Sequence, residues 1–141
     1  MILVDTNVIS EPLRKAPEAR VVEWIDAQPL ETLYLSAVTV AELRFGVASL
    51  PASKRRDRLH DSLETRVLPL FAGRVLAFDL AASQTYAQRM TAARAAGFAI
   101  SAVDGYIAAT AAANGMAVAT RDTTAFKAAG VPVINPWNTT D

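Results

Sequence analysis

Short apolar runs alternate along this chain with longer segments in which apolar residues recur every three or four positions. A short apolar run bounded by polar or turn-forming residues is typical of a strand that is buried on both faces. The runs predict strands at residues 1–4, 33–36, 75–78, 118–120 and 131–134. Strands of this kind are common in parallel sheets that are covered by helices.

Helical spacing fills the segments between these strands. Leu59, Leu63 and Val67, for example, recur every four residues and therefore share one face of a helix. Gly97 and Gly115 directly follow two of the helical segments, where glycine commonly ends a helix. The predicted helices cover residues 7–13, 17–28, 38–50, 51–67, 80–96, 102–114 and 123–129.

This alternation predicts an α/β fold with a mostly parallel sheet and helices on both of its faces. The 141 residues contain no repeat or linker and are expected to form one domain over residues 1–141. An apolar content of 52% excludes a disordered chain. The apolar runs are shorter than the roughly 20 residues that span a bilayer, and no basic segment precedes the first run as it would in a signal peptide. We therefore expect no membrane partner and a cytoplasmic protein, and the absence of cysteine permits that compartment.

Four acidic residues each adjoin an apolar segment, although they lie far apart in the sequence. Asp5 and Asp122 follow predicted strands, and Glu42 and Asp104 lie near the start of predicted helices. Sites in open α/β sheets form outside the carboxyl ends of the strands. If the fold brings the four acids together there, two carboxylates at ~4 Å repel by roughly 4 kcal/mol. Such a pocket needs a cation or protons.

Each of these acids can instead be interpreted as a helix cap. Residues 39–42 (Thr-Val-Ala-Glu) match a capping box, and residues 101–104 (Ser-Ala-Val-Asp) match its looser acidic form. Asp122 can cap a helix that begins at residue 123, and Asp5 can cap one that begins at residue 6. Taken singly, each acid fits the cap; the placement of two of them at strand ends favours a common site.

The net charge of zero argues against a nucleic-acid partner only if the charge is spread evenly. Without the four candidate acids the chain has 14 basic and 10 acidic residues. The segment at residues 54–58 (Lys-Arg-Arg-Asp-Arg) adds local positive charge. It fits phosphate contacts and a solvated helix face equally well.

Four motifs resemble those of PIN-domain ribonucleases, in particular the VapC-type toxins of bacterial toxin–antitoxin pairs, including the FitB-like branch. They are residues 4–8 (Val-Asp-Thr-Asn-Val), 39–43 (Thr-Val-Ala-Glu-Leu), 100–109 (Ile-Ser-Ala-Val-Asp-Gly-Tyr-Ile-Ala-Ala) and 120–122 (Thr-Arg-Asp), the last followed by Phe126. The resemblance covers essentially the whole chain. It implies a PIN-like three-layer α/β/α fold with a five-stranded sheet. It also implies a metal-dependent endoribonuclease toxin that hydrolyses RNA and is neutralised by a cognate antitoxin, as a homodimer or a hetero-oligomer with the antitoxin.

Carried over by motif, the resemblance places Asp5, Glu42, Asp104 and Asp122 in the catalytic site and Thr6, Asn7 and Thr120 around them. All candidate ligands are oxygen atoms, which favours Mg²⁺ or Mn²⁺ over zinc. We expect Asp5 and Asp104 to bind the metal directly and the other two acids to orient water or hold a second ion. One metal and two metals both remain possible.

The polar neighbours have narrower expected roles. Asn7 and Thr120 are expected to fix the carboxylates by hydrogen bonds. Arg121 can contact a phosphate or pair with Asp122. His60, the only histidine, is expected to be exposed or partly packed, and Trp24 is expected to pack rather than to stack on bases. The role of Trp137 stays open.

A docking surface for the antitoxin has candidates on three predicted helices. The candidates are the apolar residues Leu13, Val21, Val22, Trp24 and Ile25 and the seam over residues 43–50. Residues with this spacing more often belong to the core.

Other functions fit the sequence less well. A haloacid-dehalogenase-like phosphotransferase with Asp5 as nucleophile needs a second acid two residues later, where this chain has Asn7. A receiver domain needs an acidic pair after the first strand, and only Asp5 is present there. A non-catalytic binding module would not need four acids. A PIN nuclease of RNA processing that is not a toxin remains an alternative, because the motifs do not specify the RNA.

Overall fold

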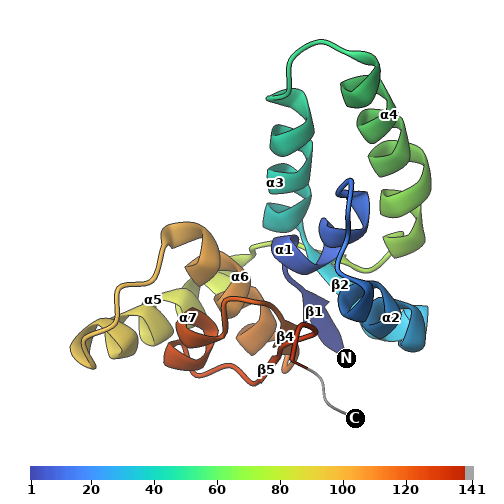
Figure 1. Ribbon diagram of the computed structural model, residues 1–141. Coiled ribbons are helices and arrows are strands. Elements are labelled where there is room, and N and C mark those ends of the chain that lie inside the picture. The colour runs from blue at the N-terminus through green and yellow to red at the C-terminus, as the bar shows by residue number, and fades with distance from the viewer. Residues whose placement is uncertain (139–141) are drawn as a thin grey trace.

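A five-stranded sheet forms the centre of the computed structural model, which describes residues 1–138 (Figure 1). The strand order is β3-β2-β1-β4-β5, and every neighbouring pair is parallel. The strands are β1 (Ile2–Val4), β2 (Leu33–Ser36), β3 (Val75–Leu76), β4 (Ala117–Ala119) and β5 (Val133–Ile134). The five predicted strands are thus confirmed, and the sheet is parallel throughout rather than mostly parallel.

Seven α-helices connect and cover the strands within the described residues. They are α1 (Thr6–Ile9), α2 (Ala19–Ala27), α3 (Ala37–Ala48), α4 (Lys54–Ser62), α5 (Leu80–Ala95), α6 (Ala102–Ala113) and α7 (Thr123–Ala128). In Figure 1, α3 and α4 form a pair that projects from the sheet, and α5, α6 and α7 lie on its other side.

Two predicted helices are interrupted. The helix expected over residues 7–13 consists of α1 and a 3₁₀ turn, Glu11–Leu13, which begins where Pro12 cannot donate a backbone hydrogen bond. The helix expected over residues 51–67 begins later, because Ser53 caps α4 by accepting a hydrogen bond from Arg56 N at 3.1 Å. It then passes into a π-helical turn, Leu63–Val67, and a 3₁₀ turn, Leu68–Phe71.

Alternate side chains of the central strands point into two apolar clusters, one on each face of the sheet. Val4 packs with Val8, Leu35 and other residues beneath α1, α2 and α3. Its neighbour Leu3 packs in the opposite direction with Ile107 and residues of α6 and α7. The predicted three-layer α/β/α arrangement is therefore confirmed.

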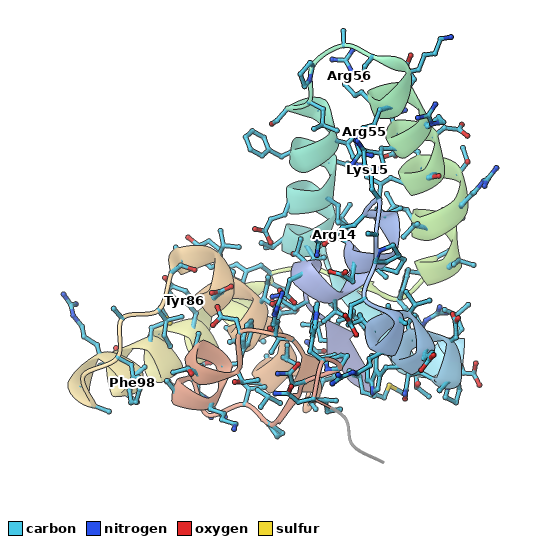
Figure 2. The ribbon with its side chains drawn as sticks, viewed as in Figure 1. Arg14, Lys15, Arg55, Arg56, Tyr86 and Phe98 are labelled. Atoms are coloured by element: carbon cyan, nitrogen blue, oxygen red, sulfur yellow. The ribbon has the colours of Figure 1, made fainter. Side chains whose placement is uncertain are left out.

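Helix α6 approaches its neighbours closely because its buried face is made of small residues. Gly105, Ala108 and Ala109 are buried, and a Cβ atom on Gly105 would lie 2.9 Å from side-chain atoms of Met90 and Tyr86 on α5. This packing fixes the first turn of α6, which carries Asp104. Figure 2 shows Tyr86 on this side of the molecule and Arg55 on the side of α3 and α4.

One buried carboxylate was not predicted from the sequence. Glu11 is only 3% exposed, and it accepts hydrogen bonds from Glu18 N at 2.8 Å and from the Arg14 guanidinium at 3.2 and 3.3 Å. These bonds, together with the nearby charge of Arg121, hold the Glu11 pKa below its ordinary value despite the opposing effect of burial. The carboxylate therefore ties α2 to the turn that follows α1.

No helix of the described residues is both long and apolar enough to cross a membrane.

Candidate active site

The carboxyl ends of β1 and β4 bring Asp5 and Thr120 into contact. The two strands are paired, and Asp5 N extends their ladder by donating to Ala119 O at 2.9 Å. One carboxylate oxygen of Asp5 accepts from Thr120 Oγ1, and the other accepts from Thr6 N, both at 2.8 Å. With only 3% of its surface exposed, Asp5 is held at both oxygens by residues that β1 and β4 position.

Glu42 reaches the same place through Thr6. Thr6 Oγ1 donates to Glu42 Oε1 at 2.6 Å and lies 3.2 Å from Thr39 Oγ1. The capping box predicted for residues 39–42 is wrong, because Ser36 caps α3 and accepts from Val38 N at 3.0 Å. Thr39 and Glu42 instead lie three residues apart within α3, on one side of the helix. That spacing was a signal for Thr39 as a further site residue, which the sequence analysis missed.

Asp104 and Asp122 lie at the starts of two further helices. Asp104 is in the first turn of α6, where its N–H donates to the capping Ser101 Oγ at 3.2 Å. Asp122 occupies the N-cap position of α7, but its side chain makes no capping hydrogen bond. Its backbone N–H donates to Thr120 Oγ1 at 2.9 Å. The Thr120 hydroxyl therefore links the loop of Asp122 to the carboxylate of Asp5.

These acids lie close enough for the charge of one to shift the pKa of another. Burial, a hydrogen bond with the Asp122 side chain and the charges of Asp5 and Asp122 together raise the pKa of Asp104 to about 6, against the opposing effect of a hydrogen bond with Ser101. Burial also raises the pKa of Asp5, with contributions from the charges of Glu42 and Asp122, while the hydrogen bonds from Thr120 and Thr6 oppose the shift. The fold thus brings the four predicted acids into one electrostatically coupled group.

Asn7 differs from its expected role, and of the two roles expected for Arg121 the ion pair with Asp122 is not seen among the described residues, whereas contact with a phosphate stays a prediction. Asn7 Oδ1 accepts from Arg121 N at 3.3 Å, so it fixes the loop after β4, and it makes no hydrogen bond to a carboxylate among the described residues. The Arg121 guanidinium lies over the Trp137 ring, 5.0 Å from its centroid, and forms no ion pair with Asp122 in the described part of the chain. Trp137, whose role the sequence left open, therefore packs against Arg121.

The remaining predictions concern packing. Trp24 is half-buried against the cluster beneath α2, and His60 is exposed on α4, as expected. Of the candidate docking residues, Val21 and Leu43 are buried in the core, whereas Leu13 and Val47 remain partly accessible.

A family model places this arrangement among known proteins. Residues 2–131 match the model of the PIN domain, which spans all four acids. The chain belongs to the PIN domain family. It is 60% identical over 137 residues to the VapC ribonuclease Y4jK of Sinorhizobium fredii, covering 97% of this chain and 98% of that protein. It is 57% identical over 138 residues to Toxin FitB of Neisseria gonorrhoeae, covering 98% of this chain and 99% of that protein.

Solved structures agree with this assignment. A chain in the structure of FitAB bound to an IR36 DNA fragment is 55% identical to this one and superposes with a TM-score of 0.97, over 100% of this chain and 99% of that chain. The five-stranded parallel sheet is therefore that of the PIN fold.

The donor set of this PIN domain suits a hard divalent cation. Every candidate ligand is a carboxylate oxygen, and burial, with a further contribution from neighbouring carboxylates, already raises the pKa values of Asp5 and Asp104. Within residues 1–138, no three acidic or histidine side chains close around a single point. Mg²⁺ is commonly bound by one or two carboxylates together with several waters, so two direct ligands fit it.

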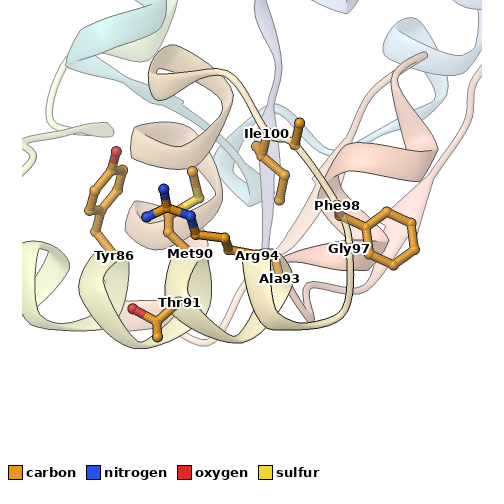
Figure 3. Close-up of a pocket in the computed structure, with 9 residues that line it drawn as sticks. Tyr86, Met90, Thr91, Ala93, Arg94, Gly97, Phe98 and Ile100 are labelled. Carbon is orange, nitrogen blue, oxygen red and sulfur yellow. The ribbon is translucent and has the colours of Figure 1, made fainter.

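One cavity of the PIN domain lies away from the acids. It has a volume of about 620 Å³ and lies between α5 and the loop that leads to α6, with Tyr86, Arg94, Phe98 and Ile100 among its lining residues (Figure 3). It is lined by no carboxylate and is therefore not the cation site.

The raised pKa of Asp104 predicts how stability depends on pH. Because the folded pKa of about 6 exceeds the ordinary value of 3.8, the folded state holds more protons between these values. The free energy of unfolding contributed by this group therefore falls as pH rises through that interval. In metal-free buffer, Asp104→Asn is expected to be more stable than the native protein at pH 7 and similar to it at pH 4. Solvent screening at this half-buried position limits the gain to about 1–2 kcal/mol.

Urea denaturation at a series of pH values measures this difference. Asp26→Asn removes an exposed carboxylate from α2 and serves as the matched control, with no pH-dependent gain expected. A stability difference between Asp104→Asn and the native protein that is the same at pH 4 and pH 7 would contradict the coupling of the acids.

Proposed function

We propose that this PIN domain is a Mg²⁺- or Mn²⁺-dependent endoribonuclease toxin of the VapC type, neutralised by a cognate antitoxin protein. The observation that carries the proposal is the group of four acids at the carboxyl edge of the sheet, in which Thr6 and Thr120 link Asp5, Glu42 and Asp122 by hydrogen bonds and Asp104 lies near enough to interact with Asp5 and Asp122. Relatives named VapC ribonuclease and Toxin FitB, at 60% and 57% identity over nearly the whole chain, support it.

In this proposal Asp5 and Asp104 hold the cation. A bound divalent ion would neutralise charge on the phosphate. It would also lower the pKa of a bound water molecule, so that the water could act as a nucleophile at neutral pH. Asp5 is suited to this role because hydrogen bonds from Thr6 and Thr120 already orient its carboxylate. Little reorganisation is then needed when an ion arrives.

Glu42 and Asp122 act on water and on the phosphodiester from two sides. Thr6 holds Glu42 Oε1, which leaves Oε2 to accept a hydrogen bond from the attacking water. The Asp122 side chain makes no capping hydrogen bond and is exposed, so it can orient a second water. In the reaction, water attacks phosphorus and the bond from phosphorus to one ribose oxygen breaks. The proton of the attacking water passes to the carboxylate that orients it, and the leaving ribose oxygen takes up a proton from solvent to become a hydroxyl.

An apolar groove provides the docking place that we propose for the antitoxin. It has a volume of about 330 Å³ and lies between α2 and the 3₁₀ turns, where Leu13, Ile25 and Phe71 line it. Leu30 and Leu70, which also line it, are 40% and 50% exposed. Adjacent exposed leucines of this kind mark an interaction surface. A basic side chain from the same partner could then reach the carboxylates and compete with the metal.

The direct test of the nuclease is removal of single charges. Asp5→Asn and Asp104→Asn keep the size of each side chain but remove a proposed metal ligand, so each is expected to reduce Mg²⁺-dependent cleavage of RNA at least a hundredfold while the far-UV circular dichroism stays native. Asp26→Asn is expected to retain full activity. If Asp104 served only as a helix cap, asparagine would replace it well, and full cleavage by Asp104→Asn would overturn its role as a ligand.

The toxin assignment has its own test. Expression of this protein alone is expected to arrest bacterial growth, and coexpression of a small protein encoded beside it is expected to restore growth. Asp5→Asn should not arrest growth, because the arrest depends on cleavage. Unimpeded growth with the active nuclease, and no adjacent gene product that binds it, would leave a PIN nuclease of RNA processing as the function.

A further inference from the structure

A second groove leads away from the carboxylates between α1, α3 and α4. It has a volume of about 310 Å³, and Thr6 and Glu42 line it at the end nearest the site. Arg55 and Leu59 of α4 line it further out. Because Glu42 lines the groove and Thr6, which also lines it, donates to both Glu42 and Asp5, the groove adjoins the acidic site. A molecule bound in the groove would therefore continue into the site.

Basic side chains lie along this groove. Arg14 and Arg55 line it, and Lys15 and Arg56 are their neighbours in the sequence. Figure 2 shows all four on the side of the molecule where α3 and α4 project, away from Tyr86 and Phe98. The zero net charge of the chain is thus unevenly distributed, with positive charge beside the acidic site.

The two arginines that line the groove can both bind an anion, but their surroundings differ. The Arg14 guanidinium is anchored by the buried Glu11 carboxylate, with Nη1 3.2 Å from Oε1, yet the arginine itself stays exposed. Arg55 is half-buried and has no ion pair or hydrogen bond among the described residues. A partly desolvated charge without a partner is unfavourable. An incoming anion would relieve that cost.

We infer that this groove holds the sugar–phosphate backbone of the RNA on the Glu42 side of the cleaved bond, with Arg14 and Arg55 contacting its phosphates. The inference rests on the proposed nuclease function. Arginine binds phosphate in a bidentate fork, which suits a strand that must be held in register. Leu43, Val47 and Leu50 form an apolar wall of the same groove and can pack against sugar or base.

An RNA strand fits this groove better than an acidic protein segment does. The groove proposed for the antitoxin is almost entirely apolar, with Asp26 as its only charged lining residue. The present groove pairs two arginines with an acid at the catalytic end. An acidic peptide attracted by the arginines would be repelled by the Glu42 carboxylate at the other end of the groove. A phosphate at that end would instead lie beside the proposed cation, which would offset the repulsion.

The experiment measures binding of a fluorescein-labelled single-stranded RNA of mixed sequence by anisotropy, in EDTA so that no cleavage occurs. Arg55→Gln is expected to weaken binding about tenfold, and the slope of log K against log salt is expected to fall by about 0.7 for one lost phosphate contact. Arg55→Lys should keep most of the slope because it keeps the charge. Arg58→Gln removes an exposed charge from the same helix outside the groove, and it should change affinity less than twofold.

Cleavage in Mg²⁺ provides a second readout. Arg55→Gln is expected to raise KM about tenfold and to leave kcat within about twofold, because a distant phosphate contact contributes equally to the ground state and the transition state. A merely structural loss would lower kcat or the melting temperature instead.

Three outcomes would overturn the inference. If Arg55→Gln binds RNA as tightly and with the same salt slope as the native protein, while the native protein still cleaves RNA, the groove assignment fails and the nuclease function stands. If Arg55→Gln retains RNA binding but loses the antitoxin, the groove belongs to the protein partner. If the native protein neither binds nor cleaves RNA in Mg²⁺, the proposed function fails and this inference fails with it.

Discussion

The hydrogen bond from Thr120 Oγ1 to Asp5 Oδ2 is the contact on which the site depends. It joins the ends of β1 and β4, two paired strands whose residues lie 115 positions apart at this point. The same Thr120 hydroxyl accepts the backbone N–H of Asp122, so one side chain positions two of the four acids. The parallel pairing of β1 with β4 is therefore what turns distant sequence motifs into one site.

Burial of the acids, together with charge repulsion among them, is the energetic cost of this arrangement. Asp5 and Asp104 both have raised pKa values, with burial as the main cause and neighbouring carboxylates adding to it. Hydrogen bonds from Thr6 and Thr120 offset part of that cost for Asp5. A site that stays folded under such repulsion is typical of one built for a cation, in which local stability is given up for function. In the groove beside this site, two arginines are proposed to offset the negative charge of the substrate phosphates in a similar way.

Much of the fold could be predicted from the sequence because strand and helix patterns are local. The strand that ends at Val4 and the helix ends near Gly97 and Gly115 followed from apolar runs and glycine positions, and the strand predicted over residues 118–120 is shifted by one residue, to Ala117–Ala119. All four glycines with positive φ among the described residues, Gly73, Gly97, Gly115 and Gly130, follow helical segments or turns. Local patterns alone could not show that the four acids meet, because this depends on which strands are neighbours in the sheet. The expectation that they meet came from the resemblance to the PIN-domain family.

What could not be predicted depends on competition between neighbours or on tertiary contacts. Ser36 caps α3 one turn before Thr39, so a valid local motif at residues 39–42 was not used. Asn7 binds Arg121 N, and Arg121 stacks on Trp137, because loops from different parts of the chain meet after β4. The burial of Glu11 and the groove lined by Arg14 and Arg55 likewise require α1, α2, α3 and α4 to be in place.

Asp5 and Asp104 are proposed to hold a cation within the group of four acids, and thermal unfolding with and without metal tests this proposal most directly. At a free Mg²⁺ or Mn²⁺ concentration ~100 times its dissociation constant, linkage predicts about 2.7 kcal/mol of added stability. The native protein and the Asp26→Asn control should therefore melt at a higher temperature when either ion is added, and Asp5→Asn should not. An unchanged Tm for the native protein in millimolar Mg²⁺ and Mn²⁺, or an equal rise in Asp5→Asn, would contradict the account.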